Sequence, residues 1–445
     1  MKTHINKGNR DGAVLAVVLI LVLALGILAA TLLSLSEDVG VEAVRDINKV
    51  NAFWTAEAGV EHAKAIAQSK RKPFGYSDYS AYTSNLKGSN VLSGTTLSGS
   101  YTVSVLDDPT WDNIIHGVKK YIITSRGIVS RGGVSYTNTV TVLATIQSFA
   151  SYMHATNWEQ NRDGSELWFT SGDIIDGPVY VNDQLNIQNS PRFLQLVKSA
   201  ATSVNYSSAN SSVFEGGLNL NVTPISGQFT GDHITDIKNS ALANGTGGLI
   251  LTNDWTFVFN TNSFTYQQGA TIRTNSVLLS NSSGGLIYVN GNATVRGVVN
   301  GKVTLAAQKS IFITNDIVYA SALSPNPWSG SFTNSVVDDY IGLVASNSVI
   351  LTMQTAVNID AAIMVTSGAS TGLEGFSALY NANNFGHPNI NLYGSLSQYR
   401  RGLIWSSSSA NGFAKNYKFD TRFINDAPPA FPYSVYVFSG WTLTQ

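Results

Sequence analysis

The sequence predicts an α+β protein with three parts: a long N-terminal helix, a small antiparallel sheet and a large all-β C-terminal module. Three observations lead to this fold class. An unbroken apolar run follows a short basic N-terminus, apolar residues then recur with helical spacing to about residue 69, and short β-branched runs punctuated by Gly, Asn and Ser begin near residue 101. Because 445 residues exceed one ordinary core, we expect separate parts, with the boundaries 1–12 (leader), 13–69 (helix), 70–147 (β head) and 148–445 (β-rich module with a C-terminal cap).

The N-terminal helix contains a stretch that is long enough to cross a membrane. The run at 13–33 has Thr31 as its only polar side chain, and about 20 apolar residues span the hydrocarbon core. Basic residues precede this run and acidic residues follow it, which favours a cytoplasmic N-terminus. We therefore expect an inner-membrane, single-pass protein whose remaining chain is periplasmic or extracellular.

A helical pattern continues beyond the membrane segment. Apolar residues recur at spacings of three, four or seven, so an amphipathic helix should extend the transmembrane one and pack on the sheet that follows; these residues are Val44, Ile47, Val50, Trp54, Ala58 and Ala65.

Three interpretations of this N-terminus compete: a cleaved secretory signal, a plain anchor, and a segment cut on its cytoplasmic side. A secretory signal usually has a shorter apolar region that ends at a small-x-small site. Gly12 lies directly before the apolar run, and Arg10 lies two residues upstream. These features disfavour the secretory signal and leave the other two interpretations.

The segment resembles the type IV pilin superfamily, in particular PilX-like minor pilins and K-type pseudopilins. The resemblance lies in Gly12 with the following AVLAVVLILVLALGIL, and in AFWTAEAGVEHAKA at 52–65, whose pilin-like motif comprises Ala56, Glu57, Ala58, Gly59 and Glu61. It implies that prepilin peptidase cuts after Gly12 and methylates the new N-terminal Ala13. It also implies a filament-core helix that includes Val14, Leu15, Val17, Leu19, Leu21, Leu23 and Leu25.

One position within this resemblance indicates the type of subunit. Position five of the mature chain is Val17, where most pilins carry a glutamate that meets the N-terminal amine of a neighbouring subunit. K-type subunits, which cap filament tips, also lack this glutamate. The resemblance therefore implies a minor or tip subunit.

The head should be a small antiparallel sheet. The segment 70–96 is rich in turn formers and predicts a loop, whereas 101–105, 120–130 and 134–146 alternate apolar and polar residues. Period-two alternation is typical of half-buried antiparallel strands.

The module after residue 147 favours a β-solenoid, with an irregular antiparallel sandwich as the alternative. Its clearest part is 284–320, where strands are expected at 286–289, 293–299, 302–306, 310–313 and 316–319. Corners recur every few residues, so alternate side chains should form interior stacks; these are Ile287, Val289, Val295, Val303, Leu305, Ile311 and Ile313. Segments 341–352 and 356–367 predict further rungs, and 192–203 is the one stretch compatible with a helix.

The C-terminal region also resembles an uncharacterised bacterial domain that often follows PilX-like N-termini. The matching pieces are 169–193, 284–320, 390–405 and YKFDTRFINDAPPAFP, followed by Trp441. This resemblance implies surface or pilus association and no reaction. We expect 414–433 to form an extended strap that closes the solenoid end, because an open β-edge would template aggregation.

The sequence gives little indication of catalysis or metal binding. The six histidines lack the H-x3-H or H-E-x-x-H spacing that brings two imidazoles to one metal; they are His4, His62, His116, His154, His233 and His387. Carboxylates occur as Asp107/Asp108, Asp338/Asp339 and Asp232/Asp236, and adjacent strand residues point to opposite faces, so they make poor catalytic pairs.

Two further polar segments are candidate binding sites. The segment 172–183 lacks the calcium-loop spacing, so Asp173 and Asp176 should stabilise turns. Arg400 and Arg401 either bind an anionic glycan or pair with carboxylates across the module, and pairing is favoured.

Composition narrows the functional classes. Charged residues are 12% and the net charge is −1, so no global field attracts nucleic acid, and without cysteine there is no thiolate chemistry. The sequence predicts a non-enzymatic minor pilin or pseudopilin of a type IV pilus or type II secretion-like filament, with an adhesion or assembly role and no cofactor. Expected partners are other pilin-like subunits, prepilin peptidase, inner-membrane assembly machinery, and a surface glycan or protein ligand. The alternatives are a membrane-anchored β-helix enzyme acting on polysaccharides and a tethered envelope scaffold.

Overall fold

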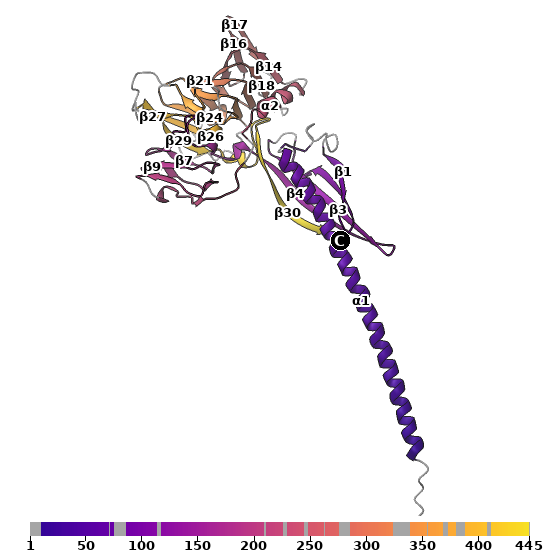
Figure 1. Ribbon diagram of the computed structural model, residues 1–445. Helices are drawn as coiled ribbons and strands as arrows, with labels where there is room; N and C mark the ends of the chain where they lie inside the picture. Colours follow the sequence, from indigo (N-terminus) through magenta and orange to yellow (C-terminus); the bar gives the residue numbers. More distant parts are fainter. Residues whose placement is uncertain are drawn as a thin grey trace, which may run out of the picture.

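The computed structural model places one long helix, a small sheet and a large β-rich module in sequence (Figure 1). It describes residues 10–70, 72–74, 86–113, 117–208, 211–225, 229–243, 248–261, 263–275, 285–323, 339–353, 355–367, 373–379, 388–406 and 411–444. Helix α1 (Arg10–Lys70) has 61 residues. Residues 13–47 of this helix are exposed, and burial begins at Asn48, so only its C-terminal part packs on the protein.

The head is an antiparallel sheet that covers the C-terminal part of α1. Its order is β1-β2-β3-β4-β30, and its strands are β1 (Gly88–Thr95), β2 (Ser100–Asp107), β3 (Lys119–Arg131), β4 (Val134–Ser148) and β30 (Tyr433–Thr444). The three predicted strands are confirmed as β2, β3 and β4. The predicted loop at 70–96 is wrong in part, because it contains β1, whose GSNVLSGT sequence is rich in turn formers. Residues 75–85 of that loop lie outside the described part of the chain.

The helix packs on the sheet with a different face from the one predicted. Its fully buried residues are small: Ala52, Ala56, Val60, Ala63 and Ala67 are 0% exposed. The predicted apolar face points away from the sheet, since Val44, Ile47, Val50 and Trp54 are 53–61% exposed. The prediction weighted side-chain size, whereas the sheet requires small residues so that the helix backbone can approach closely.

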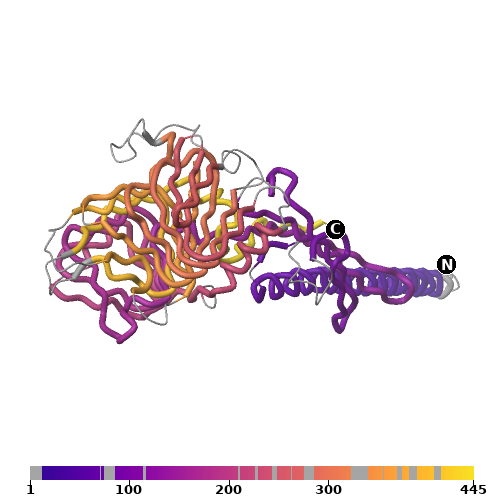
Figure 2. Tube along the Cα trace, turned by 90° about the horizontal axis from the view of Figure 1, so that it is seen from above, coloured from indigo at the N-terminus to yellow at the C-terminus, as the bar shows by residue number. Residues whose placement is uncertain are grey.

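The C-terminal module is a stack of short parallel strands, which Figure 2 shows as successive coils. Pairing in its 20-stranded sheet is parallel everywhere except among the three consecutive strands at 255–275, so the antiparallel sandwich is excluded. One column runs in the order β14 (Gly248–Thr252), β18 (Gly285–Asn290), β20 (Lys302–Ala307), β22 (Tyr340–Ala345), β24 (Val357–Val365), β26 (Asn389–Arg400), β5 (His154–Trp158), β8 (Val179–Val181), β11 (Val197–Ser199) and β13 (Leu218–Asn219).

The neighbouring columns complete the coils. One contains β15 (Trp255–Asn260), β19 (Ala293–Val299), β21 (Ser310–Tyr319), β23 (Ser348–Leu351) and β25 (Gly375–Ala378). Another contains the C-terminal halves of β19 and β21 and the N-terminal halves of β24 and β26, and it continues into β29 (Ala414–Phe419), β7 (Ile174–Asp176) and β10 (Arg192–Phe193). Two small sheets contain β6 (Trp168–Phe169), β9 (Asn186–Gln188) and β12 (Asn205–Ser207), and β27 (Trp405–Ser406) with β28 (Asn411–Gly412).

The predicted interior stacks at 284–320 are confirmed. All seven predicted interior side chains are 0% exposed: Ile287, Val289, Val295, Val303, Leu305, Ile311 and Ile313. They lie in register across rungs, for example Val295 opposite Ile313 and Ile287 opposite Leu305. Corner residues Asn290 and Asn300 are exposed, as the pattern requires. The two strands predicted at 310–313 and 316–319 form one strand, β21.

The coils are not stacked in chain order. β5, the first strand of the module, pairs on one side with β8 and on the other with β26, which lies more than 230 residues later. The chain thus enters the stack at an internal position, winds to β13, crosses over to β14 and winds back until β26 meets β5. We call this junction between the early and late rungs the seam.

A helix and a hairpin accompany the crossing to β14. Helix α2 (Asp232–Ala243) packs near β14 and β18. The helix predicted at 192–203 is wrong, because that segment forms β10 and β11. Strands β15, β16 (Ser263–Gln268) and β17 (Thr271–Asn275) pair antiparallel in chain order. The hairpin of β16 and β17 lies at the end of the molecule farthest from the N-terminus of α1 (Figure 1).

The C-terminal segment joins the module to the head and does not cap the solenoid. β29 lies within the stack between β26 and β7, so the predicted closure of a solenoid end by 414–433 is wrong. Residues 420–432, which we call the strap, cross the side of the stack, where Thr304 Oγ1 donates to Pro429 O at 2.5 Å. β30 then pairs with β4 and completes the head sheet, so the expected module at 148–445 wrongly includes a strand that belongs to the head.

Candidate functional site

The N-terminal part of α1 carries the predicted cleavage position and membrane residues. Gly12 and Ala13 lie in the first turns of the helix, and residues 1–9 lie outside the described part of the chain. The predicted membrane residues are 55–71% exposed: Val14, Leu15, Val17, Leu19, Leu21, Leu23 and Leu25. Within the described residues, α1 is long and apolar enough to span a membrane.

The motif at 52–65 is explained by close packing between helix and sheet. A Cβ at Gly59 would lie 2.8 Å from the ring of Tyr101, and one at Gly127 of β3 would lie 2.9 Å from the carbonyl carbon of Thr55. Ala56 is fully buried beside them. Glycine on both elements lets the helix approach the sheet closely.

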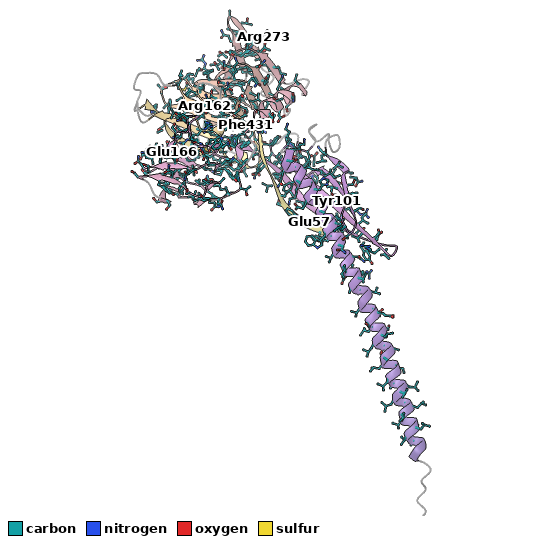
Figure 3. The ribbon with its side chains drawn as sticks, viewed as in Figure 1. Glu57, Tyr101, Arg162, Glu166, Arg273 and Phe431 are labelled. Atoms are coloured by element: carbon teal, nitrogen blue, oxygen red, sulfur yellow. The ribbon has the colours of Figure 1, made fainter. Side chains whose placement is uncertain are left out.

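The motif's charged residues lie toward the edge strand β30, and Figure 3 marks Glu57 and Tyr101 at this packing surface. Glu57 Oε1 accepts a hydrogen bond from Trp441 Nε1 at 3.3 Å. Glu61 pairs with Lys64 at 2.6 Å, and the Lys64 ammonium lies 5.1 Å from the Trp441 ring centroid. Ala58 is half-buried.

The seam of the solenoid contains buried charges. Arg401, just after β26, donates from Nη1 to Glu159 Oε2 at 2.8 Å and to Leu167 O at 3.1 Å. Lys415 of β29 pairs with Asp173 at 2.6 Å between Nζ and Oδ2. All four side chains are at most 7% exposed, and each pair joins an early rung to a late one.

The surroundings of Glu159 keep its carboxylate ionised. Burial opposes ionisation, but Arg401, the hydrogen bond from His154 and the contact with Thr156 lower the pKa of Glu159 to about 2. Burial lowers the pKa of His154, and burial also lowers the pKa of Lys415. Removing one partner from a paired and hydrogen-bonded cluster of this kind would leave an uncompensated charge buried between rungs.

An open pocket of about 390 Å³ lies beside the seam. Its walls come from the turn after β5, the approach to β25 and the segment after β26, and they include Asn161, Arg162, Asp163, Leu373, Glu374 and Leu403. Glu374 accepts from Arg162 at 2.6 Å and from Arg400 at 3.0 Å. Figure 3 marks Arg162 on this part of the module. The predicted pairing of Arg400 and Arg401 with carboxylates is confirmed.

A second buried cluster lies under the strap. Asp420 binds Arg422 at 2.5 Å, and the guanidinium lies 4.6 Å from the Tyr340 ring centroid. Asp360 accepts from the backbone of Tyr319 at 2.9 Å, and burial raises the pKa of Asp360 to about 7, the nearby Asp420 adding to this rise. This cluster fixes the start of the strap on β21, β24 and β26.

Four of the paired carboxylates named from the sequence have structural contacts. Asp107 pairs with Lys87 at 2.5 Å, Asp108 accepts from Thr110 N at 2.9 Å, and Asp236 pairs with Lys72 at 2.8 Å. The side-chain carboxylate of Asp339 accepts from Gly301 N at 2.6 Å. Asp338, His4, His116 and His387 lie outside the described residues. Among the described residues, no three or more His, Asp or Glu side chains are grouped so that they could hold a metal ion.

Sequence reasoning missed the seam residues Glu159 and Lys415. Lys415 lies on the same face of β29 as the buried Tyr417 and Phe419, because side chains two residues apart point the same way. A lysine at such an interior position indicates a buried charge that needs a partner. Nothing local distinguishes Glu159, because its partner Arg401 is 242 residues away.

Comparison with known proteins gives one partial match. Residues 120–202 match a family described as a domain of unknown function, DUF4900. The match runs from β3 of the head to β11 of the solenoid and includes the predicted piece 169–193. No curated protein sequence and no solved structure matches the chain.

Proposed function

We propose that the protein is a minor subunit of a type IV pilin-like filament that carries its β-solenoid at the filament tip or surface. The observation that carries this proposal is the division of α1. Its N-terminal half is apolar and exposed, while small residues dock its C-terminal half on an antiparallel sheet. A plain membrane anchor needs only an exposed apolar segment. A filament subunit uses both this segment and a sheet docked on the same helix.

The exposed stripe beyond the membrane segment supports assembly with other subunits. Val44, Ile47, Val50 and Trp54 extend the apolar surface of α1 along the face opposite the sheet. Contiguous apolar surface of this kind typically marks an interaction site. Neighbouring helices of a filament would cover it.

Processing of the N-terminus tests the proposal. The full chain is expressed with a prepilin peptidase, and the mature protein is analysed by intact mass and N-terminal sequencing. We expect a chain that starts at N-methylated Ala13, and retention of residues 1–12 in Gly12→Ala. Gly26→Ala is the matched control, because no atom lies within 4 Å of a Cβ at Gly26. Retention of Met1 in the wild type would favour the tethered scaffold.

Cysteine crosslinking tests the stripe directly, because the chain has no native cysteine. Ile47→Cys should form disulfide-linked subunits within filaments, whereas Ser130→Cys, exposed on the head sheet, should not. Equal crosslinking of the two variants would contradict the role of the stripe.

A further inference from the structure

We infer that the pocket beside the seam binds a neutral oligosaccharide. This inference gives the exported module of the proposed filament subunit a class of ligand. Its test requires no filament, so the two proposals can fail separately.

The first step concerns the shape and rigidity of the pocket. Its volume of about 390 Å³ lies within the roughly 300–1,000 Å³ typical of small-ligand sites. One wall is a turn fixed by its own hydrogen bonds: Asn161 N donates to Ser165 O at 2.8 Å, and Ser165 N donates to Asp163 Oδ1 at 2.9 Å. A preformed wall lowers the entropy cost of binding.

The second step concerns charge. Three guanidinium groups lie at or beside the pocket, and each pairs with a carboxylate: Arg162 and Arg400 with Glu374, and Arg401 with Glu159. Glu374, Glu159 and Asp163 supply three negative charges, which balance the three positive charges of the guanidinium groups. An anionic glycan would have to displace an existing partner, whereas a neutral ligand would not.

The third step concerns the chemistry of the lining. Carboxylate oxygens, guanidinium N–H groups and the Asn161 amide all belong to residues that line the pocket, which suits hydroxyl groups that both donate and accept. Leu373 and Leu403 add apolar surface. Neutral sugars combine these two requirements.

The fourth step concerns an aromatic platform next to the pocket. Trp158 of β5 is 38% exposed, and its ring lies 5.9 Å from the Arg400 guanidinium that also binds Glu374. An exposed indole beside polar groups can stack on the apolar face of a sugar ring.

Calorimetry with defined sugars tests the inference. The full chain, in a polyoxyethylene detergent that carries no sugar, is titrated with maltotriose, cellotriose, mannotriose and triacetylchitotriose, with trigalacturonate as the anionic comparison. We expect saturable binding of at least one neutral trisaccharide. Trp158→Ala should weaken this binding by roughly tenfold, and Asp163→Asn should also weaken it.

The matched control is Tyr206→Ala, because Tyr206 is 39% exposed elsewhere on the solenoid and its removal should leave affinity unchanged. Circular dichroism confirms that each variant is folded. Absence of saturable binding at 10 mM sugar, binding of trigalacturonate alone, or neutral-sugar binding that is insensitive to both pocket substitutions would overturn the inference.

Discussion

Gly127→Ala should loosen the head by forcing α1 away from the sheet. The new Cβ would lie 2.9 Å from Thr55 C and even closer to Ala52 O and Ala56 N. These are backbone atoms, so no rotamer change relieves the contact. Restoring an ordinary carbon separation of about 3.5 Å requires a shift of at least about 0.6 Å, and overpacking of this kind costs about 1–3 kcal/mol.

Hydrogen exchange of the full chain measures this effect locally. Amides of β3 and β4 should lose protection by roughly 5- to 140-fold, since 1.4 kcal/mol corresponds to a factor of ten. Gly40→Ala is the control on the same helix, because no atom lies within 4 Å of its Cβ; it should be neutral or slightly stabilising through helix propensity. Unchanged protection in Gly127→Ala would refute the reasoning about close packing.

Three further predictions concern the solenoid. The pKa of Asp360 is about 7 against an ordinary 3.8, so the stability that protonated Asp360 contributes is complete below about pH 4 and is lost as pH rises to 7. The melting temperature of the wild type should therefore fall between pH 4 and 8, and Asp360→Asn should flatten this fall. Lys415→Met should destabilise the module by about 3–5 kcal/mol in urea unfolding by leaving Asp173 unpaired, and adding Asp173→Leu should restore most of the loss; no rescue would show that the pair is not an energetic unit. Ile311→Asp should cost at least roughly 2–7 kcal/mol and Asn300→Ser only about 0.5 kcal/mol in the same assay, and equal costs would contradict the interior assignment.

Local sequence signals predicted the rungs but not their order. Alternation and corner residues at 284–320 identify interior side chains such as Val295 and Ile311, because strand parity is a property of neighbouring residues. The pairing of β26 with β5 depends on contacts between Arg401 and Glu159 across 242 residues. No spacing rule links such distant positions.

Hydrophobic periodicity also misassigned the packing face of α1. Large side chains such as Ile47 and Trp54 dominate the pattern, whereas Ala56 and Gly59 contribute little to it although they determine how closely the helix approaches the sheet. The destination of β30 was missed for a related reason: alternation in Tyr433–Thr444 indicates a strand but does not specify its partner.

The entry of the chain at the seam determines how mechanical load would reach the module. Two connections leave the head, one from β4 through the 3₁₀ turn Phe149–Ser151 into β5, and one from β30 back through the strap. They are tied together where Phe149 N donates to Pro432 O at 2.9 Å, close to the labelled Phe431 in Figure 3. Tension on α1 would therefore be shared by two chain segments and enter the coil stack at an internal rung. Peeling from a terminal rung, the weakest way to pull a solenoid apart, would be avoided.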